Sequence, residues 1–224
     1  MLYKIVFKRY GVIGRIVNVL GVLALVGLGS SPTRAGEAFK VLALGDSLTA
    51  GYGLAGPKAF PRQLEAALRD LGHHVTIING GVSGDTSAGG RSRLDWLVDG
   101  TIDAVIIELG ANDGMRGLDP ASTRQNIDWI IRTLKAKQVP ILLTGMLAPP
   151  NLGADYGAEF NAIYSQLATQ HGIALDPFFL QGVVADPTLN QADGLHPNAQ
   201  GVAVIVKRLV PQLLAVLKQK KRAP

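Results

Sequence analysis

The 224-residue chain contains no cysteine. Disulfide bonds, a thiol nucleophile and a lipid attached to an N-terminal cysteine are therefore excluded. The chain also lacks a Gly-Lys-Ser/Thr sequence, the loop that cradles phosphates in many nucleotide-binding domains. A ligand-binding α/β domain without enzymatic activity stays open as an interpretation, but phosphate recognition by its glycine-rich loops is poorly supported.

Acidic residues are missing from the start of the chain, and this explains the formal net charge of +5. Five of the 22 basic residues precede Gly36, where there is no acidic residue, so 17 basic and 17 acidic residues remain. The basic cluster between Lys218 and Arg222 is typical of a solvated helix end. A nucleic-acid partner is therefore not expected.

A long hydrophobic run is also missing. Residues 1–35 combine basic residues, an apolar stretch from Ile16 to Leu28 and a small, polar end, which predicts a signal peptide cleaved after Ala35 or as late as Ala38. The stretch is shorter than the roughly 20 residues that a membrane span needs, although an uncleaved anchor stays open. We expect a periplasmic or secreted monomer that has no stable membrane span after removal of the signal.

Short apolar runs alternate with amphipathic segments over the remaining residues, 36–224. The patterns predict strands at 41–44, 75–78, 102–109, 139–144 and 173–175. They predict helices at 60–71, from residue 85 or 86 to 98, and at 121–137, 155–170 and 198–217, the last bent or interrupted at Pro211. Five such alternations predict one three-layer α/β/α domain with a parallel sheet, in which a 2-1-3-4-5 strand order would gather the loops after the first three strands.

The first predicted strand runs into Gly45-Asp46-Ser47-Leu48-Thr49, a turn at the sheet edge where open α/β sheets bind ligands. Ser47 is either a helix cap or a nucleophile. The turn is not a Gly-x-Ser-x-Gly sequence, so the nucleophile elbow of the α/β-hydrolase fold is not indicated. Asp46 is expected to hold the loop by hydrogen bonds.

The second and third predicted strands end in glycine-rich loops that contain Gly84 and Asn112. Backbone N–H groups of Ser47 and Gly84 and the Asn112 amide are candidate donors to an oxyanion. Asp113 is expected to hold its loop, as Asp46 does. Glu108 lies in an apolar strand, where it needs a partner unless its side chain reaches solvent.

His196 lies in Asp193-Gly194-Leu195-His196-Pro197, where Asp193 can fold back to orient the imidazole. Ser47, His196 and Asp193 would then supply the nucleophile, base and orienting acid of a serine hydrolase. His73 and His74 have no matching cluster of ligands, so no metal site is predicted. His171 is expected at a helix end.

Four blocks of the sequence resemble the SGNH, or GDSL, hydrolases: GDSLTAGYG, SGDTS, GAND and DGLHP. The resemblance is closest to the bacterial periplasmic multifunctional esterases and covers the whole predicted mature chain. It implies the flavodoxin-like fold and a catalytic triad of Ser47, Asp193 and His196. It also implies an oxyanion hole formed by Ser47, Gly84 and Asn112, with no metal or organic cofactor.

The implied reaction is hydrolysis of small-molecule esters, thioesters or lysolipids of the arylesterase, thioesterase and lysophospholipase types. Exported carbohydrate or peptidoglycan O-deacetylation is the alternative. Apolar residues after the third and fourth predicted strands are candidates for the wall of an acyl groove: Met115, Leu118, Met146, Pro149 and Tyr156.

Overall fold

The computed structural model describes residues 38–220, so the predicted signal peptide lies outside the described residues. Its centre is a five-stranded, wholly parallel sheet in the order β2-β1-β3-β4-β5. The strands are β1 (Phe39–Gly45), β2 (Val75–Gly81), β3 (Ala104–Glu108), β4 (Ile141–Thr144) and β5 (Ala174–Asp176). The predicted α/β class and the flavodoxin-like order are confirmed.

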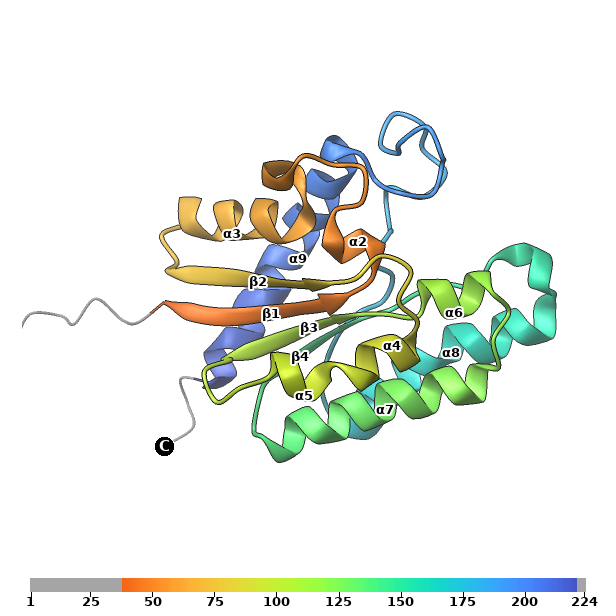
Figure 1. The fold of residues 1–224 in the computed structure, drawn as a ribbon, viewed down its shortest axis with the longest axis horizontal. Coiled ribbons are helices and arrows are strands. Elements are labelled where there is room, and N and C mark those ends of the chain that lie inside the picture. The colour runs from red at the N-terminus through yellow and green to blue at the C-terminus, as the bar shows by residue number, and fades with distance from the viewer. Residues whose placement is uncertain (1–37, 221–224) are drawn as a thin grey trace, which may run out of the picture. The chain divides into compact units, whose positions relative to one another are not determined.

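Helices cover both faces of the sheet (Figure 1). On one face α3 (Phe60–Asp70) packs against α9 (Ala199–Lys220), and on the other lie α4 (Ser87–Ser92), α5 (Leu94–Leu97), α7 (Pro120–Ala136) and α8 (Ala154–His171). The shorter elements are α2 (Ser47–Ala50), α6 (Ala111–Met115) and the 3₁₀ turns η1 (Gly56–Lys58) and η2 (Pro150–Leu152).

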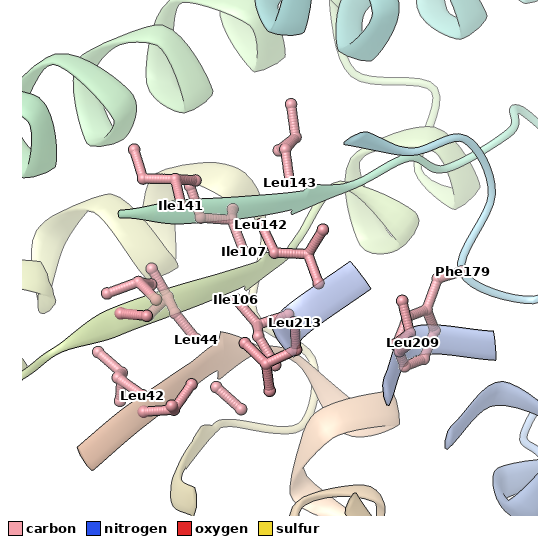
Figure 2. Close-up of a cluster of buried hydrophobic side chains, with 14 of the residues drawn as sticks. Leu42, Leu44, Ile106, Ile107, Ile141, Leu142, Leu143, Phe179, Leu209 and Leu213 are labelled. Atoms are coloured by element: carbon pink, nitrogen blue, oxygen red, sulfur yellow. The ribbon is translucent and has the colours of Figure 1, made fainter. Parts of the chain in front are cut away.

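The hydrophobic core lies between the sheet and its helices (Figure 2). Leu42, Leu44 and Ile106 in the central strands are fully buried, as expected for a parallel sheet covered on both faces. Leu209 and Leu213 bring the apolar side of α9 against this core. By length and mean hydropathy, 1.5, α9 could span a membrane, but half of its apolar window is buried, as in a core helix.

One helix prediction needs correction, and for another the structure excludes one of its two alternatives. The helix predicted up to Val98 is broken into α4 and α5 at Arg93, whose guanidinium turns inward to bind backbone carbonyls. The helix α9 runs through Pro211 without interruption. The five β-to-α connections all leave the carboxyl edge of the sheet, where the candidate residues are found, and the longest is the loop of residues 177–198 between β5 and α9.

Candidate active site

Ser47, His196 and Asp193 form a hydrogen-bonded chain at this edge. Nε2 of His196 lies 2.9 Å from Oγ of Ser47, and Nδ1 lies 2.6 Å from Oδ2 of Asp193. The serine and histidine are 149 positions apart in the sequence. The structure therefore brings together a hydroxyl, an imidazole that can accept its proton, and a carboxylate that can orient that imidazole.

The histidine loop is folded around the carboxylate of Asp193. Its Oδ1 accepts hydrogen bonds from the backbone N–H groups of Leu195 (2.9 Å) and His196 (3.0 Å). The turn between them needs a glycine, because Gly194 has a φ of +69°. The backbone N–H and the imidazole of His196 hold the pKa of Asp193 at about 2, so it is a carboxylate at neutral pH.

Gln191 joins the histidine loop to the segment after Ser47. Its side-chain amide donates to the carbonyls of Tyr52 (2.8 Å) and Pro197 (3.0 Å). The close approach requires Gly53, where a Cβ would lie 2.0 Å from the Gln191 side-chain oxygen. The ring of Tyr52 lies 4.6 Å from that of His196, so this segment also packs against the imidazole.

The turn that carries Ser47 is built on the buried carboxyl group of Glu108. Oε2 of Glu108 accepts from Asp46 N (3.2 Å) and Thr49 Oγ1 (2.7 Å). A Cβ at residue 45 would lie 2.4 Å from the same oxygen, which explains Gly45 at this position. Glu108 does not reach solvent, because its side chain is fully buried.

Burial is the largest cause of the pKa shifts of the two carboxyl groups at this turn, Glu108 and Asp46. It raises the pKa of Glu108 well above its ordinary value, and the neighbouring Asp46 charge adds to the shift. Burial also raises the pKa of Asp46 to about 6, although hydrogen bonds from Leu48 N and the Asn112 amide lower it. Burial therefore favours the protonated form of Glu108, and Asp46 accepts hydrogen bonds from Leu48 N and the Asn112 amide.

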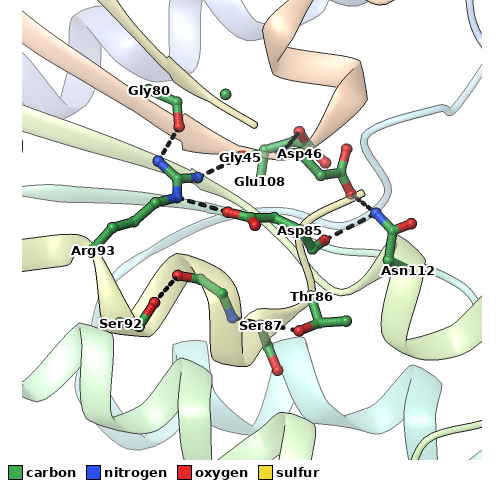
Figure 3. Close-up of polar contacts among 12 residues, drawn as sticks. Gly45, Asp46, Gly80, Asp85, Thr86, Ser87, Ser92, Arg93, Glu108 and Asn112 are labelled. Atoms are coloured by element: carbon green, nitrogen blue, oxygen red, sulfur yellow. Dashed lines mark hydrogen bonds and ion pairs between the residues drawn. The ribbon is translucent and has the colours of Figure 1, made fainter. Parts of the chain in front are cut away.

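The Asn112 amide lies between the first two loops (Figure 3). Its Nδ2 donates to Oδ2 of Asp46 (3.1 Å) and to the carbonyl of Asp85 (2.9 Å). The neighbouring carbonyl of Gly84 accepts from Arg116 (2.9 Å). No described residue accepts a hydrogen bond from the backbone N–H of Ser47 or of Gly84.

Two further polar groups hold the loops in place. Arg93 donates to the carbonyls of Gly80 (2.5 Å) and Gly45 (2.8 Å) and to the carboxylate of Asp85 (2.6 Å), so one side chain ties β1 and β2 to the second loop (Figure 3). The buried carboxylate of Asp113 accepts from Ser87 and Thr123 and so joins α6 to α4 and α7. Asp46 and Asp113 thus hold their loops, as the sequence predicts.

An apolar cavity of about 400 Å³ opens beside Ser47 and His196. Of the predicted groove residues, Met115, Met146 and Pro149 line it. Leu118 and Tyr156 do not: the Tyr156 hydroxyl donates to the Leu118 carbonyl (2.8 Å), and its ring stacks on Phe160. Sequence reasoning missed the opposite wall, which comes from the loop between β5 and α9: Phe178, Leu180, Val184 and Leu195.

The remaining motifs give no second site. Residues 38–220 hold no group of three histidine and acidic side chains placed to bind a metal ion. His171 ends α8 and pairs with Asp128 at 2.6 Å. Residues 51–56 read Gly-x-Gly-x-x-Gly, but this segment follows α2 and does not open a long helix at the end of β1, as a dinucleotide-binding turn does.

Comparison with known proteins identifies relatives over most of the chain. Residues 43–204 match the GDSL-like lipase/acylhydrolase family. An arylesterase of Vibrio mimicus is 40% identical over 186 residues, which are 83% of this chain and 92% of the relative. The Escherichia coli thioesterase 1/protease 1/lysophospholipase L1 is 38% identical over 182 residues, 80% of this chain and 86% of the relative.

A solved structure agrees with these relatives. AlinE4, an SGNH-hydrolase family esterase, superposes with a TM-score of 0.69 at 46% sequence identity, covering 80% of this chain and 97% of AlinE4. The fold and the sequence therefore point to the same group of proteins.

The raised pKa of Glu108 predicts how stability depends on pH. A carboxyl group whose pKa is raised on folding stabilises the protein below its unfolded pKa and loses that contribution as the pH rises. The substitution Glu108→Gln keeps an acceptor oxygen and removes the titration. Its free energy of unfolding, measured by urea denaturation, should therefore rise relative to that of the wild type as the pH increases above the ordinary glutamate pKa of about 4.3.

The exposed Glu159→Gln is the matched control, because it changes the same charge away from the turn. It should follow the wild type through this pH range. Parallel curves for Glu108→Gln and the wild type would show that Glu108 does not hold its proton on folding.

Proposed function

Because this chain belongs to the GDSL-like lipase/acylhydrolase family, we propose that it is a serine esterase that hydrolyses carboxylic esters and thioesters through an acyl-enzyme. The family resemblance carried by the four sequence blocks is confirmed by the match over residues 43–204. The observation that carries the proposed mechanism is the 2.9 Å contact between His196 Nε2 and Ser47 Oγ.

In the proposed reaction His196 takes the proton of Ser47 as its oxygen attacks the carbonyl carbon. The carboxylate of Asp193 holds the imidazole in place and stabilises its protonated form. The imidazolium then gives its proton to the departing alcohol or thiol. Water then attacks the acyl-enzyme as His196 takes its proton. The imidazolium returns that proton to Oγ of Ser47 as the acid departs, which leaves both residues as they began.

The developing oxyanion would be held by three donors: the backbone N–H groups of Ser47 and Gly84, and the Asn112 amide. The two N–H groups have no acceptor among residues 38–220. Both hydrogens of the Asn112 amide are already bonded, to Asp46 and Asp85. These two bonds hold the amide in place before the reaction. One of them must break when the amide donates to the oxyanion.

A fluorophosphonate probe tests the nucleophile. It should label the wild type, and Ser47→Ala should abolish labelling and ester hydrolysis, because the probe bonds to an activated serine oxygen. Labelling is measured by intact-protein mass spectrometry.

Ser83→Ala is the matched control, since it removes an exposed hydroxyl from the loop after β2. It should label as the wild type does. A wild type that takes up no probe, or a Ser47→Ala variant that still does, would refute the proposed nucleophile.

The cavity supports substrates with an apolar acyl chain. Its lining consists almost entirely of aliphatic or aromatic side chains, and it also includes Ser47 and His196. Relatives of this chain are named arylesterase and thioesterase 1/protease 1/lysophospholipase L1. Esters, thioesters and lysophospholipids all carry an acyl group. We infer that the acyl chain occupies the cavity and the leaving group points to solvent.

Narrowing the cavity should shorten the preferred acyl chain. Val184→Trp should lower kcat/KM for p-nitrophenyl octanoate about tenfold or more relative to p-nitrophenyl acetate, since each methylene in an apolar pocket contributes roughly tenfold or more to discrimination. The two rates are compared in steady-state assays.

Val204→Trp, the same change at an exposed position of α9 outside the cavity, should leave the ratio unchanged. An unchanged ratio in Val184→Trp would place the acyl chain elsewhere. A wild type that prefers an acetylated sugar to both esters would instead favour the O-deacetylase.

We further propose export to the periplasm, or secretion, by the signal peptide predicted at residues 1–35, with one mature domain from Gly36 onward. N-terminal sequencing of the exported protein should begin at Gly36 or Phe39. A sequence that begins at Met1 would indicate a retained anchor.

A further inference from the structure

Exposed apolar side chains gather at one edge of the molecule. Ten large hydrophobic residues among the described ones are exposed, and seven lie at the carboxyl edge of the sheet: Tyr52, Val82, Met115, Leu118, Leu147, Val184 and Leu195. Together we call these seven the apolar rim. The other three, Leu71, Trp96 and Val204, lie in or next to helices away from the cavity. Scattered exposed apolar residues are ordinary, whereas a cluster of them marks an interaction surface.

The apolar rim is continuous with the cavity. Met115, Leu147, Val184 and Leu195 line the cavity and are also exposed, and the Tyr52 ring packs on His196. Val82 and Leu118 are each two positions in the sequence from a partner of the hydrogen bond between Arg116 and the Gly84 carbonyl, which joins the loop after β2 to the segment after α6. The apolar rim therefore includes four side chains of the cavity wall and one side chain that packs on the histidine beside it.

The charges near the apolar rim are nearly balanced. The exposed ionisable residues of the five β-to-α loops are two basic and two acidic: Lys58, Arg116, Asp119 and Asp193. A surface that binds anionic lipids carries an excess of lysine and arginine. The balance here fits a surface with no net charge.

We propose that the apolar rim seats the enzyme on the surface of a zwitterionic phospholipid bilayer, with the cavity opening toward the acyl chains. The proposal rests on the proposed function, because a lysolipid held in a bilayer presents its acyl chain at that surface. Burial of the rim side chains in the interface provides the attraction, and the cavity then receives the acyl chain without its crossing water.

Vesicles of ether-linked phosphatidylcholine, which an esterase cannot cleave, test the proposal. The protein expressed from Gly36 onward is used, because residues 38–220 contain the described core. It should sediment with the vesicles, and Val82→Ser combined with Leu118→Ser should weaken the apparent binding about tenfold, since two apolar side chains leave the interface. Binding should change little in about 0.5 M salt. At this ionic strength the Debye length is only a few ångströms, so attraction between charges is screened while apolar contacts are not.

The matched control combines Leu71→Ser with Trp96→Ser, which removes two exposed apolar side chains away from the cavity, one of them 90% exposed. This control should bind as the wild type does. Both double variants should hydrolyse p-nitrophenyl acetate at the wild-type rate, because none of the four residues lines the cavity.

Three results would overturn the proposal: no binding of the wild type, equal losses in the two double variants, or binding only to anionic vesicles and only at low salt. Each concerns the surface and not the chemistry, since labelling of Ser47 is measured separately. If the fluorophosphonate probe labels the wild type but the wild type does not bind vesicles, the proposed function stands and the proposed membrane contact is refuted.

Discussion

The side-chain amide of Asn112 is the contact on which the geometry of the site depends. It donates to Asp46 in the loop after β1 and to the carbonyl of Asp85 in the loop after β2, while itself belonging to α6 after β3. One amide therefore sets the spacing of three loops. Its acceptor Asp46 is held in turn by Glu108, which accepts the Asp46 N–H from the end of β3.

Strand order explains why these loops can meet. In the order β2-β1-β3-β4-β5, the first strand lies between the second and the third, so their carboxyl ends are neighbours. Short polar side chains and close glycines then fill the edge where the strands end. The histidine loop comes from the far end of the chain and is tied to the segment after Ser47 by Gln191.

Much of this arrangement could be read from the sequence. Buried strands are near-continuous apolar runs, and the Asp193 to His196 spacing is a local turn, so both are visible without coordinates. The wall formed by Phe178, Leu180 and Val184 was missed because an irregular loop has no periodicity to show which side chains face inward. The break at Arg93 was missed because its acceptors, the carbonyls of Gly45 and Gly80, are distant in sequence. The prediction that Tyr156 lines the groove was wrong, because its hydroxyl donates a hydrogen bond to the Leu118 carbonyl and its side chain does not line the cavity.

A crystal structure of the protein after reaction with a phosphonate ester tests the central claim most directly. The account predicts phosphorus bonded to Oγ of Ser47, with the phosphonyl oxygen about 3 Å from the N–H groups of Ser47 and Gly84 and from the Asn112 amide. One of the two hydrogen bonds of that amide should be broken. A phosphonyl oxygen that points away from these donors, with Asn112 still bonded to both Asp46 and Asp85, would contradict the account.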